Sequence, residues 1–170
     1  MAESPQSSDR FTGAAVVMGV ASCGKTTIGE AIAERLGVRF IEGDRLHAPE
    51  SVAKMSAGIP LTDDDRWPWL ARIGESLRGG EGAVAACSAL KKSYRQAIAE
   101  SAGRPVYFVF LQGSRELLAR RIAERKGHFM PPTLLDSQLA TLEPPGTDER
   151  AMAIDIAALP EDIVDRAVAY

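Results

Sequence analysis

The residues with the clearest chemical role begin at Gly19, where the chain reads Gly-Val-Ala-Ser-Cys-Gly-Lys-Thr. This segment matches the phosphate-binding pattern G-x-x-x-x-G-K-[ST] at every fixed position. Gly19 and Gly24 let the backbone curl so that N–H groups point at phosphate oxygens. Lys25 can reach the β- and γ-phosphates, and the Thr26 hydroxyl can bind Mg²⁺. The pattern predicts a nucleoside triphosphate site formed by Gly19, Val20, Ala21, Ser22, Cys23, Gly24, Lys25, Thr26 and Thr27.

A carboxylate suited to acid–base chemistry follows at Asp44. It comes after the second apolar stretch of the chain, so it lies close to the transferred phosphate if the strands form a parallel sheet. A carboxylate in this place can accept the proton of a substrate hydroxyl or help to hold the Mg²⁺ shell. The alternative is that Asp44 only forms a turn or caps a helix.

Two arginines, Arg121 and Arg125, are spaced to share one face of an expected helix. They precede the loop 127–132, which contains glycine and two prolines. Arginines that enter a mobile loop suit a lid that closes over the nucleotide and neutralises charge during phosphoryl transfer. The alternative is that both arginines are simply solvated on the helix surface.

Further polar residues are suited to binding an organic acid. Lys91 and Arg95 are expected to converge on one spot near Ser88, where two cations suit a carboxylate or a phosphate. Groups that can bind the hydroxyls of a polyhydroxy acid are also present, and they are His47, Lys54, Asp65 and Arg66.

These residues have structural alternatives. His47 could cap the helix expected from Pro49, and the neighbours of Asp65 are expected only to solvate a loop. That loop, which contains Asp63 and Asp64, would precede a helix that begins at Trp67.

The elements that position these residues alternate between apolar strands and helices. Continuous apolar strands separated by helices predict an α/β fold in three layers, with a five-stranded parallel sheet covered on both faces. Ligands then bind beyond the carboxyl ends of the strands. Strands are expected at 14–18, 38–42, 83–87, 106–111 and about 152–156, and helices at 27–36, 49–57, 67–78, 90–101, 114–126, 133–142 and 160–169.

The composition is typical of one globular domain. The chain has 170 residues, 45% of them hydrophobic and 25% charged, and a net charge of −3, so neither nucleic acid nor an anionic membrane is an expected partner. Residues 1–12 are polar and are expected to form a disordered tail of a cytoplasmic protein, followed by a single domain at 13–170. Cys23 and Cys87 are expected to be reduced.

A phosphate-binding loop alone does not distinguish an ATPase, a GTPase switch and a small-molecule kinase. The guanine-reading sequence Asn/Thr-Lys-x-Asp does not occur in the chain. With Asp44 and the arginine pair, this favours a small-molecule kinase. A kinase of shikimate, of another sugar acid or of a nucleoside monophosphate stays open, and so does a nucleotide sensor without turnover.

Longer motifs resemble the gluconokinase family over nearly the whole chain. They are Glu-Gly-Asp-x-x-His at 42–47, Lys-Met-x-x-Gly-x-Pro-Leu-x-Asp-Asp-Asp-Arg-x-x-Trp-Leu at 54–70, Cys-Ser-Ala-Leu-Lys-x-x-Tyr-Arg at 87–95, Arg-x-x-x-Arg-x-Gly-His-Phe-Met at 121–130 and Leu-Leu-x-Ser-Gln-x-x-x-Leu-Glu at 134–143. The resemblance implies a P-loop kinase fold with a small lid at about 126–133. It implies ATP- and Mg²⁺-dependent phosphorylation of the 6-hydroxyl of D-gluconate, and often a homodimer.

The resemblance also implies roles for individual residues. Asp44 would orient the hydroxyl and take its proton, Arg125 would meet the transferring phosphoryl group, and Arg121 would lie against the adenine or the α-phosphate. The family often has Asp where Glu42 stands, so the longer side chain could alter the surroundings of the metal. Further contacts to the acid are expected within these motifs from Ser88, His128 and Gln138.

Overall fold

One parallel sheet forms the centre of the molecule. The computed structural model describes residues 11–124 and 132–169, and in these residues the strand order is β2-β3-β1-β4-β5 with every pair parallel. The predicted five-stranded α/β fold is therefore confirmed. The strands are β1 Ala14–Met18, β2 Arg39–Glu42, β3 Ala83–Ala86, β4 Val106–Gln112 and β5 Ala151–Asp155.

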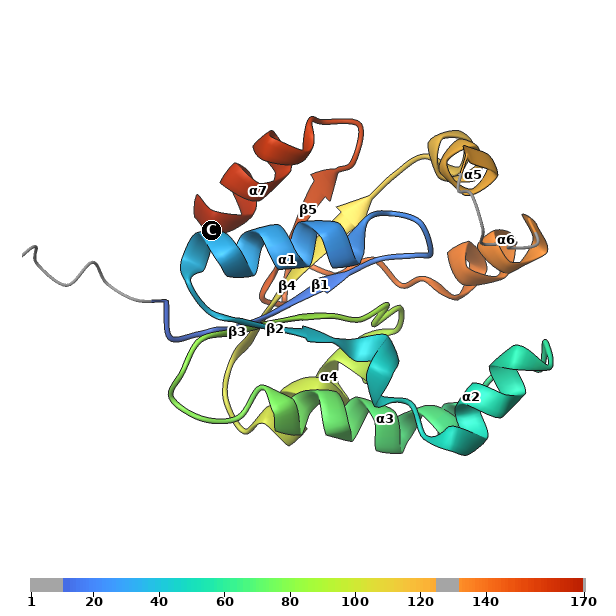
Figure 1. Cartoon of the computed structure of the whole chain (residues 1–170), viewed down its shortest axis with the longest axis horizontal. Helices are drawn as coiled ribbons and strands as arrows, with labels where there is room; N and C mark the ends of the chain where they lie inside the picture. The colour runs from blue at the N-terminus through green and yellow to red at the C-terminus, as the bar shows by residue number, and fades with distance from the viewer. Residues whose placement is uncertain (1–10, 125–131, 170) are drawn as a thin grey trace, which may run out of the picture.

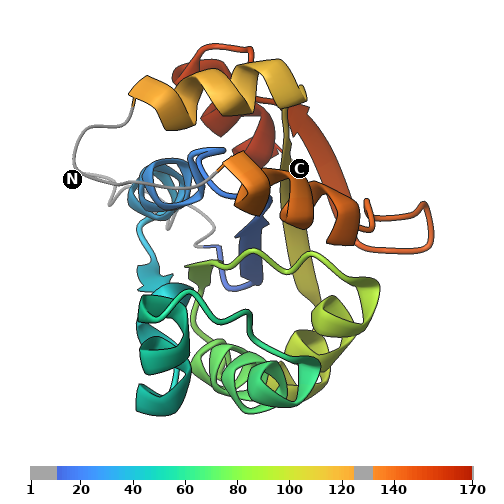
Figure 2. The same ribbon diagram turned by 90° about the vertical axis from the view of Figure 1, so that its right-hand side faces the viewer.

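Helices cover both faces of the sheet, as the three-layer prediction requires. In Figure 1, α1 and α7 lie on one side of the sheet and α3 and α4 on the other. Figure 2 shows α5 and α6 on the same side as α1. The helices are α1 Lys25–Leu36, the 3₁₀ turn η1 Gly43–Leu46, α2 Pro49–Ser56, α3 Asp63–Ser76, α4 Lys92–Ala102, α5 Arg115–Glu124, α6 Pro132–Thr141 and α7 Pro160–Ala169.

The central strand β1 supplies side chains to both cores, because successive residues of a strand point to opposite faces. Val16 and Met18 belong to the apolar cluster that contains Ile73 of α3. Val17 belongs to the cluster on the other face, which contains Ile32 of α1. All five residues of β1 are buried, which explains why this strand reads as an unbroken apolar run.

The start of α3 differs from the prediction. The helix begins at Asp63, not Trp67, because Thr62 and Asp65 form a capping box. The Thr62 hydroxyl accepts the Asp65 N–H at 3.2 Å, and an Asp65 carboxylate oxygen accepts the Thr62 N–H at 2.9 Å. Pro68 lies inside the helix. The part of the chain that was expected to be a loop before Trp67 is therefore helical from Asp63 on, and Asp63 and Asp64 lie in the first turn.

Two further local features were not predicted. The turn η1 follows β2 directly and carries Asp44. Helix α4 begins at Lys92, two residues later than predicted, because Ala89 has a positive φ of 45° and Lys91 is extended. Lys91 is therefore the residue before the helix and not part of its first turn.

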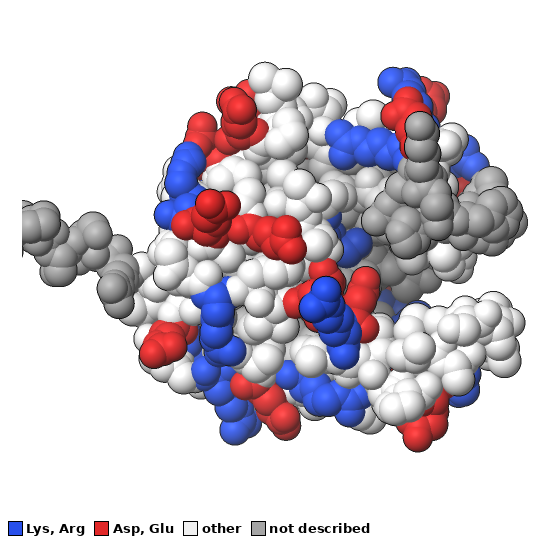
Figure 3. All heavy atoms as spheres, in the orientation of Figure 1, with Lys and Arg blue, Asp and Glu red and all other residues white. Residues whose placement is uncertain are grey.

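The carboxyl ends of the strands meet at one edge of the sheet. The phosphate-binding loop follows β1, η1 follows β2 and the segment 87–91 follows β3. Figure 3 shows the surface hollowed beside the part formed by α2, with side chains of both charges next to it. Among the described residues, no helix has the length and apolar character that a membrane span requires.

Candidate functional site

The phosphate-binding loop has the backbone that its glycines were predicted to supply. Gly19 and Gly24 have φ values of 148° and 92°. A Cβ at Gly19 would lie 2.7 Å from the Cys23 sulfur and 2.9 Å from the Leu111 carbonyl oxygen, so only glycine fits. Lys25 begins α1 and donates from Nζ to the Val20 carbonyl oxygen at 3.0 Å. The loop therefore ends on the N-terminus of a helix, which favours bound anions.

Oxygen atoms suited to Mg²⁺ lie beside this loop. The Thr26 hydroxyl donates to a Glu42 carboxylate oxygen at 2.5 Å, which joins the start of α1 to the end of β2. Among the described residues, no group of three or more His, Cys, Asp and Glu side chains could hold a metal by itself. Mg²⁺ commonly binds to one or two protein oxygens together with phosphate and water oxygens, and Thr26 and Glu42 fit that donor set.

Asp44 lies at the same edge as Lys25. Its side chain is exposed on η1, and its N–H points to the Glu42 carboxylate at 3.4 Å. Both groups act on the buried thiol of Cys87. Burial raises the pKa of this thiol to about 12, Lys25 opposes the rise, and Asp44 and Glu42 add to it. One side chain at the end of β3 thus lies within the electrostatic range of all three charges.

A cluster of four polar side chains joins α3 to the segment before α4. The Lys91 amine lies 3.4 Å from both oxygens of Asp63, and the Arg66 guanidinium lies 3.8 Å from the nearer one. Arg66 donates to the Tyr94 hydroxyl at 2.9 Å, and that hydroxyl donates to Asp63. The hydrogen bond from Tyr94, followed by that from Lys91, lowers the pKa of Asp63. Two cations face one carboxylate, so the cluster carries a net charge of +1.

His47 directly follows η1 and stacks on Trp69. The ring centroids are 4.0 Å apart with an interplanar angle of 18°, and the indole N–H of Trp69 donates to the Gly43 carbonyl oxygen at 2.8 Å. Burial lowers the pKa of His47. The Nδ1 atom is buried and has no hydrogen-bond partner in the part of the chain that the structure describes. This nitrogen is closed to solvent, so a contact of His47 with a substrate hydroxyl would have to come from the accessible part of the ring.

Lys54 and Asp65 pair with each other between α2 and α3. The Lys54 amine lies 2.9 Å from both oxygens of Asp65. The Thr62 N–H, followed by the Lys54 amine, lowers the pKa of Asp65 to about 2. Each charged group is held in place by the other, so the pair presents an ammonium and a carboxylate in fixed positions between α2 and α3.

Known proteins share both the sequence and this architecture. A protein-family model described as an AAA domain matches residues 15–145. A gluconokinase of Gluconobacter oxydans is 47% identical over 159 residues, which cover 91% of this chain and 89% of that protein. A gluconokinase structure from Sinorhizobium meliloti 1021 has 57% sequence identity and a TM-score of 0.87, and the match covers 94% of this chain and 91% of that one.

The chain belongs to this AAA domain family and, within it, to the gluconokinases. The thermosensitive gluconokinase of Escherichia coli is 44% identical over 83% of this chain and 78% of its own length. A shikimate kinase from Bacteroides thetaiotaomicron has a TM-score of 0.66 at 19% identity, a likeness of fold alone.

One predicted contact of this gluconokinase site needs correction. Arg95 does not converge with Lys91, because Lys91 precedes α4 and the helical spacing does not apply. The Arg95 side chain is 1% exposed and binds Glu149 through Nε at 2.7 Å and Nη2 at 3.1 Å. It also donates to the carbonyl oxygens of Ala89 at 2.8 Å and Glu143 at 2.9 Å. Arg95 therefore supports the turn before α4 from inside the protein.

The late arginines can be followed only in part. Arg121 donates to the Ile156 carbonyl oxygen at 3.0 Å, and its charge reaches Cys23 in the phosphate-binding loop. It therefore lies on the nucleotide side of the site. Arg125 and His128 lie outside the described residues, together with most of the expected lid.

Two remaining predicted residues contact the phosphate-binding loop. The Ser88 carbonyl oxygen accepts the Gly19 N–H at 3.2 Å. The Gln138 side chain on α6 accepts the Ala21 N–H at 2.7 Å. Gln138 was expected to contact the acid, but its hydrogen bond in the structure is to the nucleotide loop.

The sequence did not identify Asp63, Tyr94 or Glu149 as part of the site or its support. The motif Cys-Ser-Ala-Leu-Lys-x-x-Tyr-Arg contained Tyr94, and the first turn of α3 contained Asp63. Asp63 could have been found by noting that Thr62 and Asp65 fit a capping box, which places Asp63 at the start of a helix. No comparable signal pairs Tyr94 with Asp63. No signal in the sequence pairs Glu149 with Arg95.

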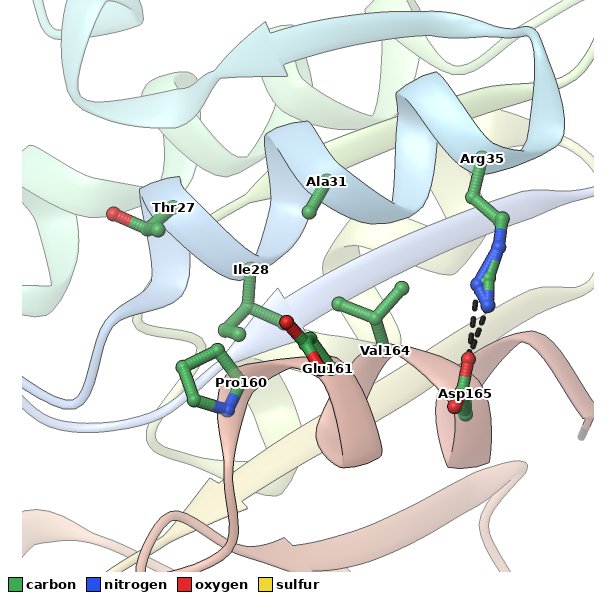
Figure 4. Close-up of a pocket in the computed structure, with 8 residues that line it drawn as sticks. All are labelled: Thr27, Ile28, Ala31, Arg35, Pro160, Glu161, Val164 and Asp165. Atoms are coloured by element: carbon green, nitrogen blue, oxygen red, sulfur yellow. Dashed lines mark hydrogen bonds and ion pairs between the residues drawn. The ribbon is translucent and has the colours of Figure 1, made fainter.

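An open groove between α1 and α7 lies apart from these groups. Its volume is about 440 Å³, and Figure 4 shows Ile28 and Val164 facing one another in it, with the ion pair of Arg35 and Asp165 at one end. Thr27 is the one predicted site residue among those that line it in the described chain. The groove therefore does not mark the place of the chemistry.

Proposed function

We propose that this chain transfers the γ-phosphoryl group of ATP to the 6-hydroxyl of D-gluconate and so forms 6-phospho-D-gluconate and ADP. The proposal rests on one arrangement: a complete phosphate-binding loop and a cluster of net charge +1 meet at the same edge of the sheet. The membership of the chain in the gluconokinases supports gluconate over other acceptors.

The nucleotide would bind on the loop and the start of α1. Backbone N–H groups and Lys25 contact the phosphates, and the helix N-terminus favours their negative charge. Mg²⁺, when bound, would neutralise charge on the β- and γ-phosphates, and Thr26 and Glu42 have the oxygens to hold it. Arg121 would lie against the nucleotide, and Arg125 would reach the transferring group.

The acid would lie across the strand ends. Its carboxylate binds Lys91 and Arg66, which already hold the carboxylate of Asp63. Its hydroxyls would bind the pair formed by Lys54 and Asp65 and the part of the His47 imidazole that is not buried. Further contacts would come from Ser88 and His128.

Asp44 would orient the 6-hydroxyl and accept its proton as the oxygen attacks the phosphorus atom. An exposed carboxylate at the edge that carries Lys25 is suited to that step, because a general base must be free to accept a proton when the transfer begins. Two expectations from the resemblance, a homodimer and a cytoplasmic location, stay predictions.

The test is ADP release measured with gluconate, other sugar acids, shikimate and nucleoside monophosphates. Stimulation by gluconate alone supports the proposal, and stimulation by none supports a nucleotide sensor. We expect Lys25→Ala and Asp44→Asn each to lower turnover by roughly 100-fold or more. Asp64→Asn is the matched control, because Asp64 is exposed in the first turn of α3 and takes no part in the site. Near-normal turnover of Asp44→Asn would remove Asp44 as the base.

A further inference from the structure

We propose that Gln138 is a positioning residue that holds the phosphate-binding loop from α6 and thereby orients Lys25. Its Oε1 atom accepts the Ala21 N–H at 2.7 Å across a sequence separation of 117 residues. No hydrogen bond to the acid-binding cluster accompanies this contact among the described residues. The inference adds a residue to the proposed phosphoryl transfer and rests on that function for its kinetic consequence.

The contact acts on the peptide group between Val20 and Ala21. The carbonyl oxygen of this group accepts the Lys25 amine at 3.0 Å, while its N–H donates to Gln138. The peptide is trans, so the C=O and N–H bonds point in opposite directions in one plane. Gln138 and the Lys25 amine therefore lie on opposite sides of the same peptide group.

In this geometry Gln138 can act on the position of Lys25 without contacting the Lys25 amine. If the peptide rotated, the Val20 carbonyl oxygen would leave the Lys25 amine. The loop has positive φ values of 148° at Gly19 and 63° at Ser22, so its backbone conformation depends on surrounding contacts that hold it. A hydrogen bond to the N–H from outside the loop stops the rotation without occupying the face that carries Lys25.

Helix α6 is itself well supported at this point. Leu135, one turn before Gln138, is 1% exposed in the core under α1 and α7. At the other end, the Glu143 N–H donates to the Leu90 carbonyl oxygen at 2.8 Å, and the Glu143 carboxylate accepts the Lys92 N–H at 3.2 Å. The amide of Gln138 thus extends from a fixed backbone, which a positioning side chain requires.

The role requires an oxygen acceptor and no donor. Gln138→Leu removes the acceptor at similar size, and Gln138→Glu keeps it. Ser137→Ala is the control, because Ser137 is exposed on the same helix. We expect Gln138→Leu to speed hydrogen exchange of the Ala21 amide and to lower kcat roughly tenfold, with the KM for gluconate changed less than about twofold. Gln138→Glu should restore slow exchange of the Ala21 amide, while its added negative charge beside the phosphate site should weaken nucleotide binding.

Hydrogen exchange of the Ala21 amide is measured without the acid, so it tests the contact even if gluconate proves not to be the acceptor. A thermal unfolding midpoint close to that of the control shows that each variant is folded. Unchanged Ala21 exchange in Gln138→Leu would overturn the proposal. So would a raised KM for gluconate with normal kcat in Gln138→Leu, since that outcome assigns the side chain to the substrate. A Gln138→Glu variant whose Ala21 amide exchanges as fast as that of Gln138→Leu would overturn it too.

Discussion

Replacing Arg95 by leucine should destabilise the protein by about 3–5 kcal/mol, the usual cost of breaking a buried ion pair by removing one partner. The side chains of Arg95 and Glu149 are 1% and 12% exposed, so solvent screens their interaction little. After the substitution, the Glu149 carboxylate retains the Gly146 N–H at 2.9 Å among the bonds of the described residues. The carbonyl oxygens of Ala89 and Glu143 also lose their shared donor.

Thermal unfolding measures this loss. For a chain of this length, 1 kcal/mol shifts the midpoint by roughly 2–4 °C, so the expected fall is about 6–20 °C. Arg35→Leu is the matched control, because its ion pair with Asp165 has exposed fractions of 47% and 59% and should contribute only about 0–1 kcal/mol. The double variant Arg95→Leu/Glu149→Leu should be more stable than Arg95→Leu alone, since it leaves no unpaired charge.

The same pair makes stability depend on acid. Hydrogen bonds from Arg95 hold the pKa of Glu149 below its ordinary value. Its contribution is therefore complete at neutral pH and is lost as the pH falls below about 4.5 toward the lower folded-state pKa. In Arg95→Leu this part of the acid dependence should disappear. If the variant is as stable as Arg35→Leu and keeps the same acid dependence, Arg95 is not the support inferred from its contacts.

Three further predictions concern the site itself. Glu42→Gln should weaken Mg²⁺ binding roughly tenfold without changing metal-free ADP affinity, measured by calorimetry; equal Mg²⁺ affinity would place the metal elsewhere. Asp63→Asn raises the charge of its cluster from +1 to +2. The ratio of the inhibition constant of a sugar monocarboxylate to that of a sugar dicarboxylate should therefore rise about fivefold. An unchanged ratio would contradict a carboxylate site there. Burial raises the pKa of Cys23 and Cys87, so iodoacetamide should label the folded protein at least ~100-fold more slowly than free cysteine at pH 7.5, and labelling at the free rate would refute their burial.

Most of the fold could be predicted because burial leaves a local trace in the sequence. All of β1 and β3 is buried, and both read as apolar runs. The phosphate-binding loop could also be predicted from a local pattern, since Gly19, Gly24 and Lys25 lie within one short segment. The start of α3 was missed although its signal is equally local: Thr62 and Asp65 cap the helix with each other's backbone.

The parts of the site that were not predicted depend on partners far apart in the chain. Arg95 and Glu149 are separated by 54 residues, and Gln138 and Ala21 by 117. Helical spacing suggested that Arg95 would accompany Lys91, but the spacing rule fails when one of the two residues precedes the helix. Arg95 was thus assigned to the substrate because it is a cation next to a substrate motif, although its partner in the structure is Glu149.

These long-range polar contacts have a common location. Gln138 binds the loop that follows β1, and the Glu143 backbone binds both Leu90 and Arg95 beside the turn that follows β3. The end of α6 and the two residues after it therefore contact the nucleotide side and the acid side of the site within six residues, 138–143. Apolar burial holds the sheet and its helices together, but it cannot fix two loops at a solvent-filled edge, where apolar side chains would face water. Directional hydrogen bonds from one short segment, residues 138–143, can fix them. For that reason the distance between Lys25 and the acid-binding cluster should depend more on Gln138, Glu143 and Arg95 than on any core side chain of equal size.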